Sequence, residues 1–160
     1  MGSCLSINSF NKSQQLLLQS SIQPYTIKGK RFARITKIYD GDTFTANILD
    51  DTTSQVHSYK VRLLGIDSPE IKDKQHSQQA LISRGVLAKL CTDCDIDINK
   101  DCNLSYNDLT KKLITNKKII LLDCQEHFDK YGRVLATVFV DDLCINQYMI
   151  NNQYAKAYII

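Results

Sequence analysis

The sequence predicts one domain of the α+β class, mainly β-sheet with a small number of helices. Apolar and polar residues alternate across 33–64, and segments rich in Ile, Leu and Val lie at 118–123 and 134–140. Between them, apolar residues over 78–91 recur at helical spacing. The chain has 160 residues, 43% hydrophobic and 23% charged, which is ordinary for a globular fold and enough to bury one core.

Residues 1–30 are interpreted as a tail that precedes a domain at 31–160. Gly2, with Ser6, fits the pattern for N-myristoylation, and Cys4 lies where a palmitate can follow. One myristoyl chain binds membranes with only about 10⁴ M⁻¹, so stable anchoring requires the second chain. The alternative is that this short pattern arises by chance. With no apolar run near the roughly 18 residues of a membrane span and no secretory signal, we expect a cytoplasmic chain, held at the membrane's cytoplasmic face if acylated.

The first three strands are expected at 33–39, 44–49 and 58–64, where the alternation is clearest. The Asp-Gly-Asp-Thr segment at 40–43 separates the first two strands, and we expect Gly41 to permit a tight turn there. Together these segments predict an antiparallel meander.

A helix is expected next, because Ala80, Leu87 and Cys91 fall along one face at helical spacing, with Leu81 and Ala88 beside them. Strands rich in branched apolar residues then follow, and a short apolar segment has helical character. These later elements are strands at 118–123 and 134–140, a helix at 143–151 and a closing strand at 154–160.

Three strands, a helix, two strands and another helix match the five-stranded Greek-key barrel known as the OB-fold, whose groove commonly receives nucleic acid. Segment 92–117 is an insertion in this order and is rich in Asp, Asn and Lys. Its alternating Asp93, Asp95 and Asp97 lack the glycine and glutamate of an EF-hand, so we expect a solvated surface loop. The net charge of +3 mildly favours a polyanionic partner.

The six cysteines raise the question of a structural metal site. Cys91 and Cys94 have the spacing of half a zinc site, and Cys102, Cys124 or His127 are the candidates to complete it. No second close pair of ligands is present, however, and thiols stay reduced in a cytosolic chain. We expect these cysteines to be buried or incidental.

Three segments combine carboxylates with arginines. They are Asp-Gly-Asp-Thr at 40–43, Arg-Leu-Leu-Gly-Ile-Asp-Ser-Pro-Glu at 62–70 and Asp-Lys-Tyr-Gly-Arg at 129–133. Carboxylates bind Ca²⁺ or Mg²⁺, and the planar fork of arginine matches phosphate oxygens in pairs, so this mixture suits a site that breaks a phosphodiester. Taken singly, each segment has a structural alternative: Arg62 can pair with Asp67, and 129–133 can be a hairpin turn.

Through these motifs, from about residue 34 to residue 158, the sequence resembles the staphylococcal nuclease (thermonuclease) family. The resemblance implies the OB-fold and a Ca²⁺ ion held by Asp42, Asp67 and the main-chain carbonyl of Ser68, with Asp40 in support. Serine stands where the family typically has threonine. Because the ligand there is a main-chain oxygen, this difference should matter little.

The resemblance also implies a reaction. Glu70 is the family's proposed general base, although this role is argued over, and Arg62 and Arg133 stabilise the charge that develops on the phosphate. The expected function is a Ca²⁺-dependent endonuclease that cleaves DNA and RNA with low sequence specificity, leaves 3′-phosphates and needs no obligate protein partner. Three further positions match residues that line the family's nucleotide pocket: Lys130, Tyr131 and Tyr158.

Two features keep an alternative open, namely a non-catalytic, membrane-tethered module that binds nucleic acid or protein. Some family members have lost catalytic residues, although this chain retains Arg62, Glu70 and Arg133. The family also continues into another helix after the last strand, for which the sequence has no counterpart. The tail or segment 92–117 could cover the exposed apolar surface; if neither does, the domain is expected to fold poorly alone or to need a partner or a membrane.

Overall fold

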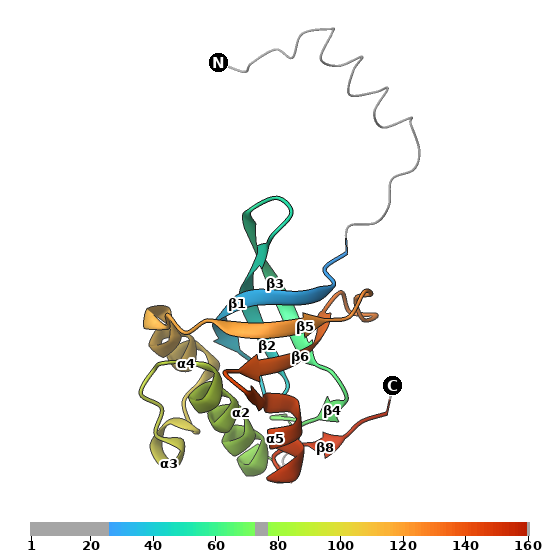
Figure 1. Cartoon of the computed structure of the whole chain (residues 1–160). Helices are drawn as coiled ribbons and strands as arrows, with labels where there is room; N and C mark the ends of the chain where they lie inside the picture. Colours follow the sequence, from blue (N-terminus) through green and yellow to red (C-terminus); the bar gives the residue numbers. More distant parts are fainter. Residues whose placement is uncertain (1–25, 73–76, 160) are drawn as a thin grey trace, which may run out of the picture.

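The structure is a computed structural model that describes residues 26–72 and 77–159. Its strands wrap into a barrel and its helices gather at one end of that barrel (Figure 1). The expected acylation sites, Gly2 and Cys4, lie outside the described residues. No helix within the described ranges is long and apolar enough to cross a membrane.

The first three strands form the expected antiparallel meander. They are β1 (Gly29–Ile38), β2 (Thr43–Asp50) and β3 (Gln55–Leu63), and β2 pairs with both of its neighbours. The alternate residues of β2 are buried, because their side chains point into the barrel. Since β1 begins at Gly29, its first two residues fall within the expected tail.

The sheet is closed by a pairing between strands that lie far apart in the chain. The strands β5 (Ile120–Cys124), β6 (Val134–Val140) and β7 (Leu143–Cys144) extend the sheet in the order β3-β2-β1-β5-β6-β7. In addition, β6 runs parallel to β3, with Val61 opposite Val134. The five long strands therefore form a closed barrel, which confirms the predicted OB-fold class.

Two helices cover the core at the end of the barrel. They are α2 (Ser77–Cys91) and α5 (Ile145–Asn151), near the two predicted helical segments. Leu87 and Met149 of these helices are fully buried together with barrel residues such as Ile35, Phe44 and Leu122. Burial of such side chains contributes about 1.5–3 kcal/mol each, so this cluster is the main source of stability.

The predicted closing strand is wrong in both extent and position. Only Lys156–Ala157 is a strand, β8, and it pairs with the two-residue strand β4 (Ile66–Asp67) in a separate small sheet. The backbone N–H of Tyr158 donates to the carbonyl of Gly65 at 2.9 Å. The C-terminal segment therefore supports the turn that carries Asp67 and Ser68 and does not extend the barrel.

The predicted surface loop at 92–117 is also wrong, because the segment folds into helices. These are α3 (Ile98–Asp101), α4 (Tyr106–Lys112) and the 3₁₀-helix η1 (Leu113–Thr115). Side chains of Asp97 and Ser105 cap the first two. Apolar residues spaced along the segment reach the core, which is why it packs down: they are Ile96, Leu109 and Leu113.

Polar contacts fasten this helical insertion to the rest of the domain. Arg84 of α2, which is 3% exposed, donates from Nη2 to the carbonyls of Cys102 and Leu104. The buried Asn116 donates from its side-chain amide to the carbonyl of Ile35 in β1 at 2.9 Å. The insertion is thus tied to both a core helix and a barrel strand.

Replacing Arg84 with methionine is expected to lower the free energy of unfolding by about 2 kcal/mol, because two carbonyls lose their donor. Urea denaturation measures this loss, and hydrogen exchange should accelerate in the insertion. The control is Lys111→Met, on the exposed face of α4. Unchanged stability of Arg84→Met would mean that the insertion is held mainly by its apolar contacts.

Three of the five cysteines in the described part of the chain are buried, namely Cys91, Cys102 and Cys124, and two are half-buried. All five in the described chain are free, and burial raises the pKa of Cys91 to about 12 and that of Cys124 to about 11. Within the described ranges, no group of three or more His, Cys, Asp or Glu residues is placed to hold a metal ion. A zinc site built on Cys91 and Cys94 therefore has no support in the described structure.

Candidate active site

One open cavity, of about 980 Å³, collects side chains from all three motifs. Its lining comes from the end of β1, from β3 and β4, and from the connection between β5 and β6. The carboxylates of Asp40, Asp67 and Glu70 and the guanidinium groups of Arg62 and Arg133 all line it. The fold therefore brings together residues that lie far apart in sequence.

Asp42 lies beneath the cavity and links two of the motifs. It is 1% exposed, and its Oδ1 accepts hydrogen bonds from Arg62 Nη1 at 2.6 Å and Thr43 Oγ1 at 2.9 Å. Its Oδ2 accepts from the backbone N–H of Ser68 at 2.6 Å. The first motif thus fixes the backbone position of the second.

Arg62 bridges two carboxylates. Its Nη2 donates to Asp67 Oδ1 at 2.8 Å, while its Nη1 holds Asp42. Burial acts to lower the pKa of Arg62, but the negative charges of Asp42 and Asp67 outweigh burial and raise it. The structural alternative of an Arg62–Asp67 pair is therefore present, and the same pair lines the cavity.

Negative charge exceeds positive charge at this end of the cavity. Three carboxylates, those of Asp40, Asp42 and Asp67, surround the single guanidinium of Arg62. Burial and the neighbouring charge of Asp42 raise the pKa of Asp40 to about 7. Such a cluster is stabilised by an added cation.

Of the three ligands expected for that cation, Asp67 lines the cavity, whereas Asp42 and Ser68 are buried beneath it and both Asp42 carboxylate oxygens accept hydrogen bonds. Asp42, Asp67 and the main-chain carbonyl of Ser68 have the chemistry that Ca²⁺ or Mg²⁺ prefers. Because the described residues offer no set of three ready-placed ligating side chains, water would have to complete the coordination. The chemistry of these oxygen donors fits a divalent cation, but in the described structure the Asp42 carboxylate is bonded to Arg62, Thr43 and the Ser68 N–H instead.

Gly41 acts by close approach and not by turn conformation, which corrects the expectation from sequence. Its φ is not among the positive values in the described chain. A Cβ at this position would lie 2.8 Å from Ser83 Cβ and 2.9 Å from Ser68 Cβ, and would collide with Ser83 Oγ. Only glycine lets the first motif pack against both α2 and the second motif.

The third motif forms a tight turn around one carboxylate. Asp129 accepts hydrogen bonds from the backbone N–H groups of Tyr131 and Arg133, both at 2.9 Å, and from Arg133 Nε at 2.7 Å. Gly132 has a φ of +73°, which glycine adopts without strain. The expected hairpin turn is present, and it holds Arg133 at the cavity wall.

Acid is expected to weaken this turn. Burial acts to raise the pKa of Asp129, but hydrogen bonds from Arg133 and Tyr131 outweigh it and lower that pKa. The stabilisation is therefore present above the unfolded pKa of about 3.9 and is lost as pH falls through the lower folded value. Asp129→Asn should cost about 1 kcal/mol at pH 7, and this cost should shrink as pH falls below about 3.9, as measured by urea denaturation across pH. A cost that does not change between pH 7 and the acid limit of folding would contradict this assignment.

The expected substrate-binding residues lie at the rim of the cavity. Tyr131 is 71% exposed and Tyr158 is 54% exposed, and Lys130 is also exposed. The Arg133 guanidinium lies 5.1 Å from the centre of the Tyr131 ring, a cation–π arrangement. Both aromatic rings therefore present surface to a ligand.

Several residues of this region were not predicted as site residues from the sequence. Tyr39, Lys60 and Phe128 line the cavity, and Thr43 hydrogen-bonds to Asp42. Lys60 precedes Arg62 by two positions on one strand, so strand alternation places both on the same face. That spacing is the signal by which Lys60 could have been found.

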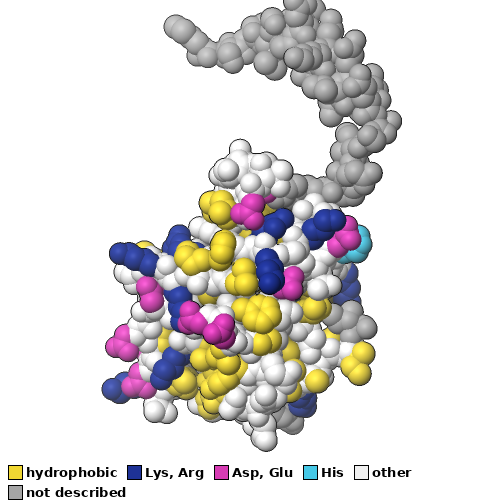
Figure 2. All heavy atoms as spheres, viewed as in Figure 1, with side chains coloured by type: hydrophobic (Ala, Val, Ile, Leu, Met, Phe, Trp, Pro, Cys, Tyr) yellow, Lys and Arg dark blue, Asp and Glu magenta, His cyan; other side chains and the backbone are white. Residues whose placement is uncertain are grey.

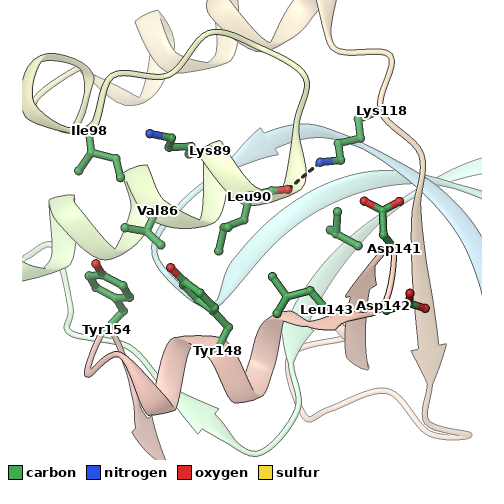
Figure 3. A pocket seen from close by; sticks show the side chains of 11 residues that line it. Val86, Lys89, Leu90, Ile98, Lys118, Asp141, Asp142, Leu143, Tyr148 and Tyr154 are labelled. Carbon is green, nitrogen blue, oxygen red and sulfur yellow. Dashed lines mark hydrogen bonds between the residues drawn. The ribbon is translucent and has the colours of Figure 1, made fainter.

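A second hollow, of about 750 Å³, has a different character. Val86 and Leu90 of α2 face Leu143 and Tyr148 across it, and Lys118 Nζ donates to the Leu90 carbonyl at 3.0 Å (Figure 3). None of the predicted site residues lines it. Figure 2 shows basic, acidic and hydrophobic side chains intermixed on the face of the molecule viewed there. The first cavity is therefore the stronger candidate site.

Comparisons with known proteins support the resemblance to the staphylococcal nuclease family. The family described as staphylococcal nuclease homologue matches residues 60–160, a segment with the second and third motifs but not the first. The chain is 27% identical over 131 residues to a thermonuclease of Staphylococcus intermedius, covering 82% of this chain and 61% of that protein. It is 26% identical over 134 residues to an uncharacterised protein of Methanocaldococcus jannaschii, covering 80% of this chain and 59% of that protein. The chain thus spans about 60% of the length of these relatives.

Proposed function

Because this chain belongs to the staphylococcal nuclease homologue family, we propose that it is a Ca²⁺-dependent endonuclease that hydrolyses phosphodiester bonds of DNA and RNA. We further propose low sequence specificity and 3′-phosphate products. The observation that carries the proposal is the single cavity lined by Glu70, Arg62 and Arg133 above the buried Asp42. Glutamate and two arginines around one cavity have the chemistry to attack and stabilise a phosphodiester.

Asp42, Asp67 and the Ser68 carbonyl would hold the Ca²⁺ ion, and Asp40 would support them. The bound ion would supply Lewis-acid stabilisation of charge on the phosphate. The negative charge around Arg62 supports this arrangement, because it lacks a matching number of cationic groups among its immediate neighbours.

The chain's own side chains would bind and orient the reacting groups. Glu70 would accept the proton of the water that attacks phosphorus. Arg62 of β3, fixed by two carboxylates, and Arg133, fixed by Asp129 in the turn before β6, would contact the phosphate from two sides of the barrel closure. One arginine would hold the phosphate throughout, and the other would stabilise the charge on the departing 5′ oxygen.

Low sequence specificity follows from the kinds of contact available at the rim. Tyr131 and Tyr158 offer aromatic faces on which any base can stack, and Lys130 offers a charge for phosphate. Stacking and phosphate contacts carry little sequence information. Both DNA and RNA are therefore proposed as substrates.

The test is cleavage of a labelled single-stranded DNA by the purified full chain with Ca²⁺, with Mg²⁺ and with a chelator. Wild type should cut only with a divalent cation, and Glu70→Gln should reduce the rate by about 10²–10⁴-fold. Arg133→Ala should be similarly impaired. Glu126→Gln, an exposed glutamate paired with Lys28, is the matched control and should cut normally.

A folded wild type that binds the DNA and cuts nothing would favour the alternative of a non-catalytic binding module.

We also propose that the chain is attached to a membrane through acyl groups on Gly2 and Cys4, and this proposal is tested separately. Gly2→Ala should move the full chain from the membrane fraction to the soluble fraction of cells that support acylation. An unchanged distribution would contradict the anchor without bearing on the nuclease.

A further inference from the structure

A row of polar side chains crosses three strands beside Arg62. In the barrel, Lys37 of β1 pairs with Thr45 of β2, and Thr45 pairs with Lys60 of β3. A register shift in β1 lies just before Lys37, and such bulges commonly redirect side chains near functional sites. Both lysines are exposed, so the row lies on the outer face of the barrel.

This row continues directly into the candidate active site. Lys60 and Arg62 are two residues apart on β3, which places them on the same face about 6.7 Å apart along the strand. Lys60 also lines the same cavity as Arg62. Three cationic groups, those of Arg62, Lys60 and Lys37, therefore lie along one path that leads out of the cavity.

Tyr39 lies at the centre of this path. Lys60 Nζ is 4.7 Å from the centre of the Tyr39 ring, and the Tyr39 hydroxyl is 3.0 Å from Thr45 Oγ1. Burial acts to raise the pKa of Tyr39, but its hydrogen bonds and the charges of Lys60 and Lys37 outweigh burial and lower it. The ring therefore lies within the field of both lysines.

The helical insertion holds this ring in place. Tyr106, at the start of α4, stacks on Tyr39 with ring centres 5.2 Å apart and planes 18° apart. Burial and the Tyr39 hydroxyl raise the pKa of Tyr106 to about 12. The insertion thus supplies the aromatic side chain that stacks on Tyr39 of the cavity lining, which a solvated loop would not do.

We propose that Lys37, Lys60 and Tyr39 form a second subsite that binds the single-stranded nucleic acid beyond the phosphate held by Arg62, and that Tyr106 positions this subsite. The subsite rests on the proposed nuclease function and specifies its substrate as a single strand of several nucleotides. Cationic groups that track a backbone, with an aromatic side chain among them, are the features by which proteins bind single strands. An unpaired strand can meet charge and ring together, whereas a duplex presents its bases stacked inside.

The first test measures how binding depends on salt and on substrate length. The probes are fluorescein-labelled oligothymidylates of twelve and of three nucleotides, in Ca²⁺, with all proteins in a Glu70→Gln background that suppresses cleavage. Replacing Lys37 and Lys60 with methionine should lower the salt slope for the twelve-mer by about 0.7 per lysine and weaken its binding roughly fivefold per lysine at 0.1 M salt. The loss should be smaller for the three-mer. Lys89→Met, an exposed lysine of α2 at the second hollow, should bind both probes like the parent.

The second test concerns Tyr106 as a positioning residue. Tyr106→Ala should weaken binding of the twelve-mer several-fold more than binding of the three-mer, and Tyr106→Phe should restore it, because phenylalanine keeps the stacked ring. Lost stability alone would weaken both probes equally and is recorded by urea denaturation of each variant.

The outcomes separate the two proposals. Cleavage by wild type, together with equal salt slopes for the parent, Lys89→Met and the Lys37/Lys60 variants, would overturn the subsite and leave the nuclease intact. A folded wild type that neither binds the twelve-mer nor cuts DNA would overturn both. Equal losses on the two probes would mean that the lysines contact only the phosphates next to the scissile bond, which also overturns the subsite.

Discussion

Replacing Arg62 with leucine is expected to lower the free energy of unfolding by about 3–5 kcal/mol, because it leaves the buried Asp42 carboxylate without its cationic partner. The Arg62 side chain is 18% exposed and the Asp42 side chain is 2% exposed, so water screens this pair poorly. Urea denaturation at pH 7 measures the loss. Under the proposed function, the same substitution should also abolish measurable cleavage.

A second substitution separates the effect of Arg62→Leu on stability from its effect on cleavage. Adding Asp42→Asn removes the unpaired charge but keeps an oxygen that accepts from the Ser68 N–H. The double variant should therefore recover much of the stability and remain inactive. If Arg62→Leu costs less than about 1 kcal/mol, Asp42 must be reached by water and the pair is not buried as described.

Replacing Gly41 with alanine is expected to lower the free energy of unfolding by about 3 kcal/mol, at the upper end of overpacking effects. The new Cβ would overlap the Ser83 side chain and crowd Ser68 at 2.9 Å. Neither neighbour can move freely, because Ser83 Oγ donates to the Tyr154 carbonyl and the Ser68 N–H donates to Asp42. Urea denaturation of the variant measures the loss.

Gly85→Ala is the matched control, because Gly85 is also buried but its added Cβ would meet Cys102 Cβ at an ordinary 3.4 Å. Alanine also favours the helix, so Gly85→Ala should be neutral or slightly stabilising. Adding Ser83→Gly to Gly41→Ala should recover part of the loss by removing the overlapping atoms. Equal stabilities of Gly41→Ala and Gly85→Ala would show that the first motif can shift without cost.

The barrel could be predicted because its strands carry a local signal. Alternation marks each strand without reference to the rest of the fold, and β6 was located at its observed bounds. The three motifs could also be expected to meet, because each lies at a strand end or strand connection. Closure between β3 and β6 then follows from the predicted barrel topology.

The insertion could not be read in the same way, because its apolar residues are sparse and separated by charged ones. Ile96, Leu109 and Leu113 do not form a regular helical stripe, and α3 and α4 are short. One local signal of a helix start was present, namely Ser105 followed three residues later by Asp108. The Ser105 hydroxyl accepts a hydrogen bond from the Asp108 backbone N–H and donates one to the Asp108 carboxylate. The high content of Asp, Asn and Lys in 92–117 nevertheless favoured the prediction of a solvated loop.

Two features of the site depend on contacts that no local pattern reports. Gly41 is needed because Ser83, from a helix much later in the chain, lies against it. Tyr39 and Tyr106 stack only because the insertion folds back beside β1. Both contacts join segments that are distant in sequence, so they depend on the tertiary fold and not on local sequence.

The parallel pairing of β3 with β6 has a consequence for protein synthesis. Arg62 lies in β3 and Arg133 directly precedes β6, so the two arginines come together only when these strands pair. Contacts between segments so distant in sequence form late, because the intervening chain must first be ordered. A nascent chain that has not yet emerged beyond β6 therefore has an incomplete phosphate site. Under the proposed function, the ribosomal and messenger RNA around it would not be cleaved before β6 has emerged and paired with β3.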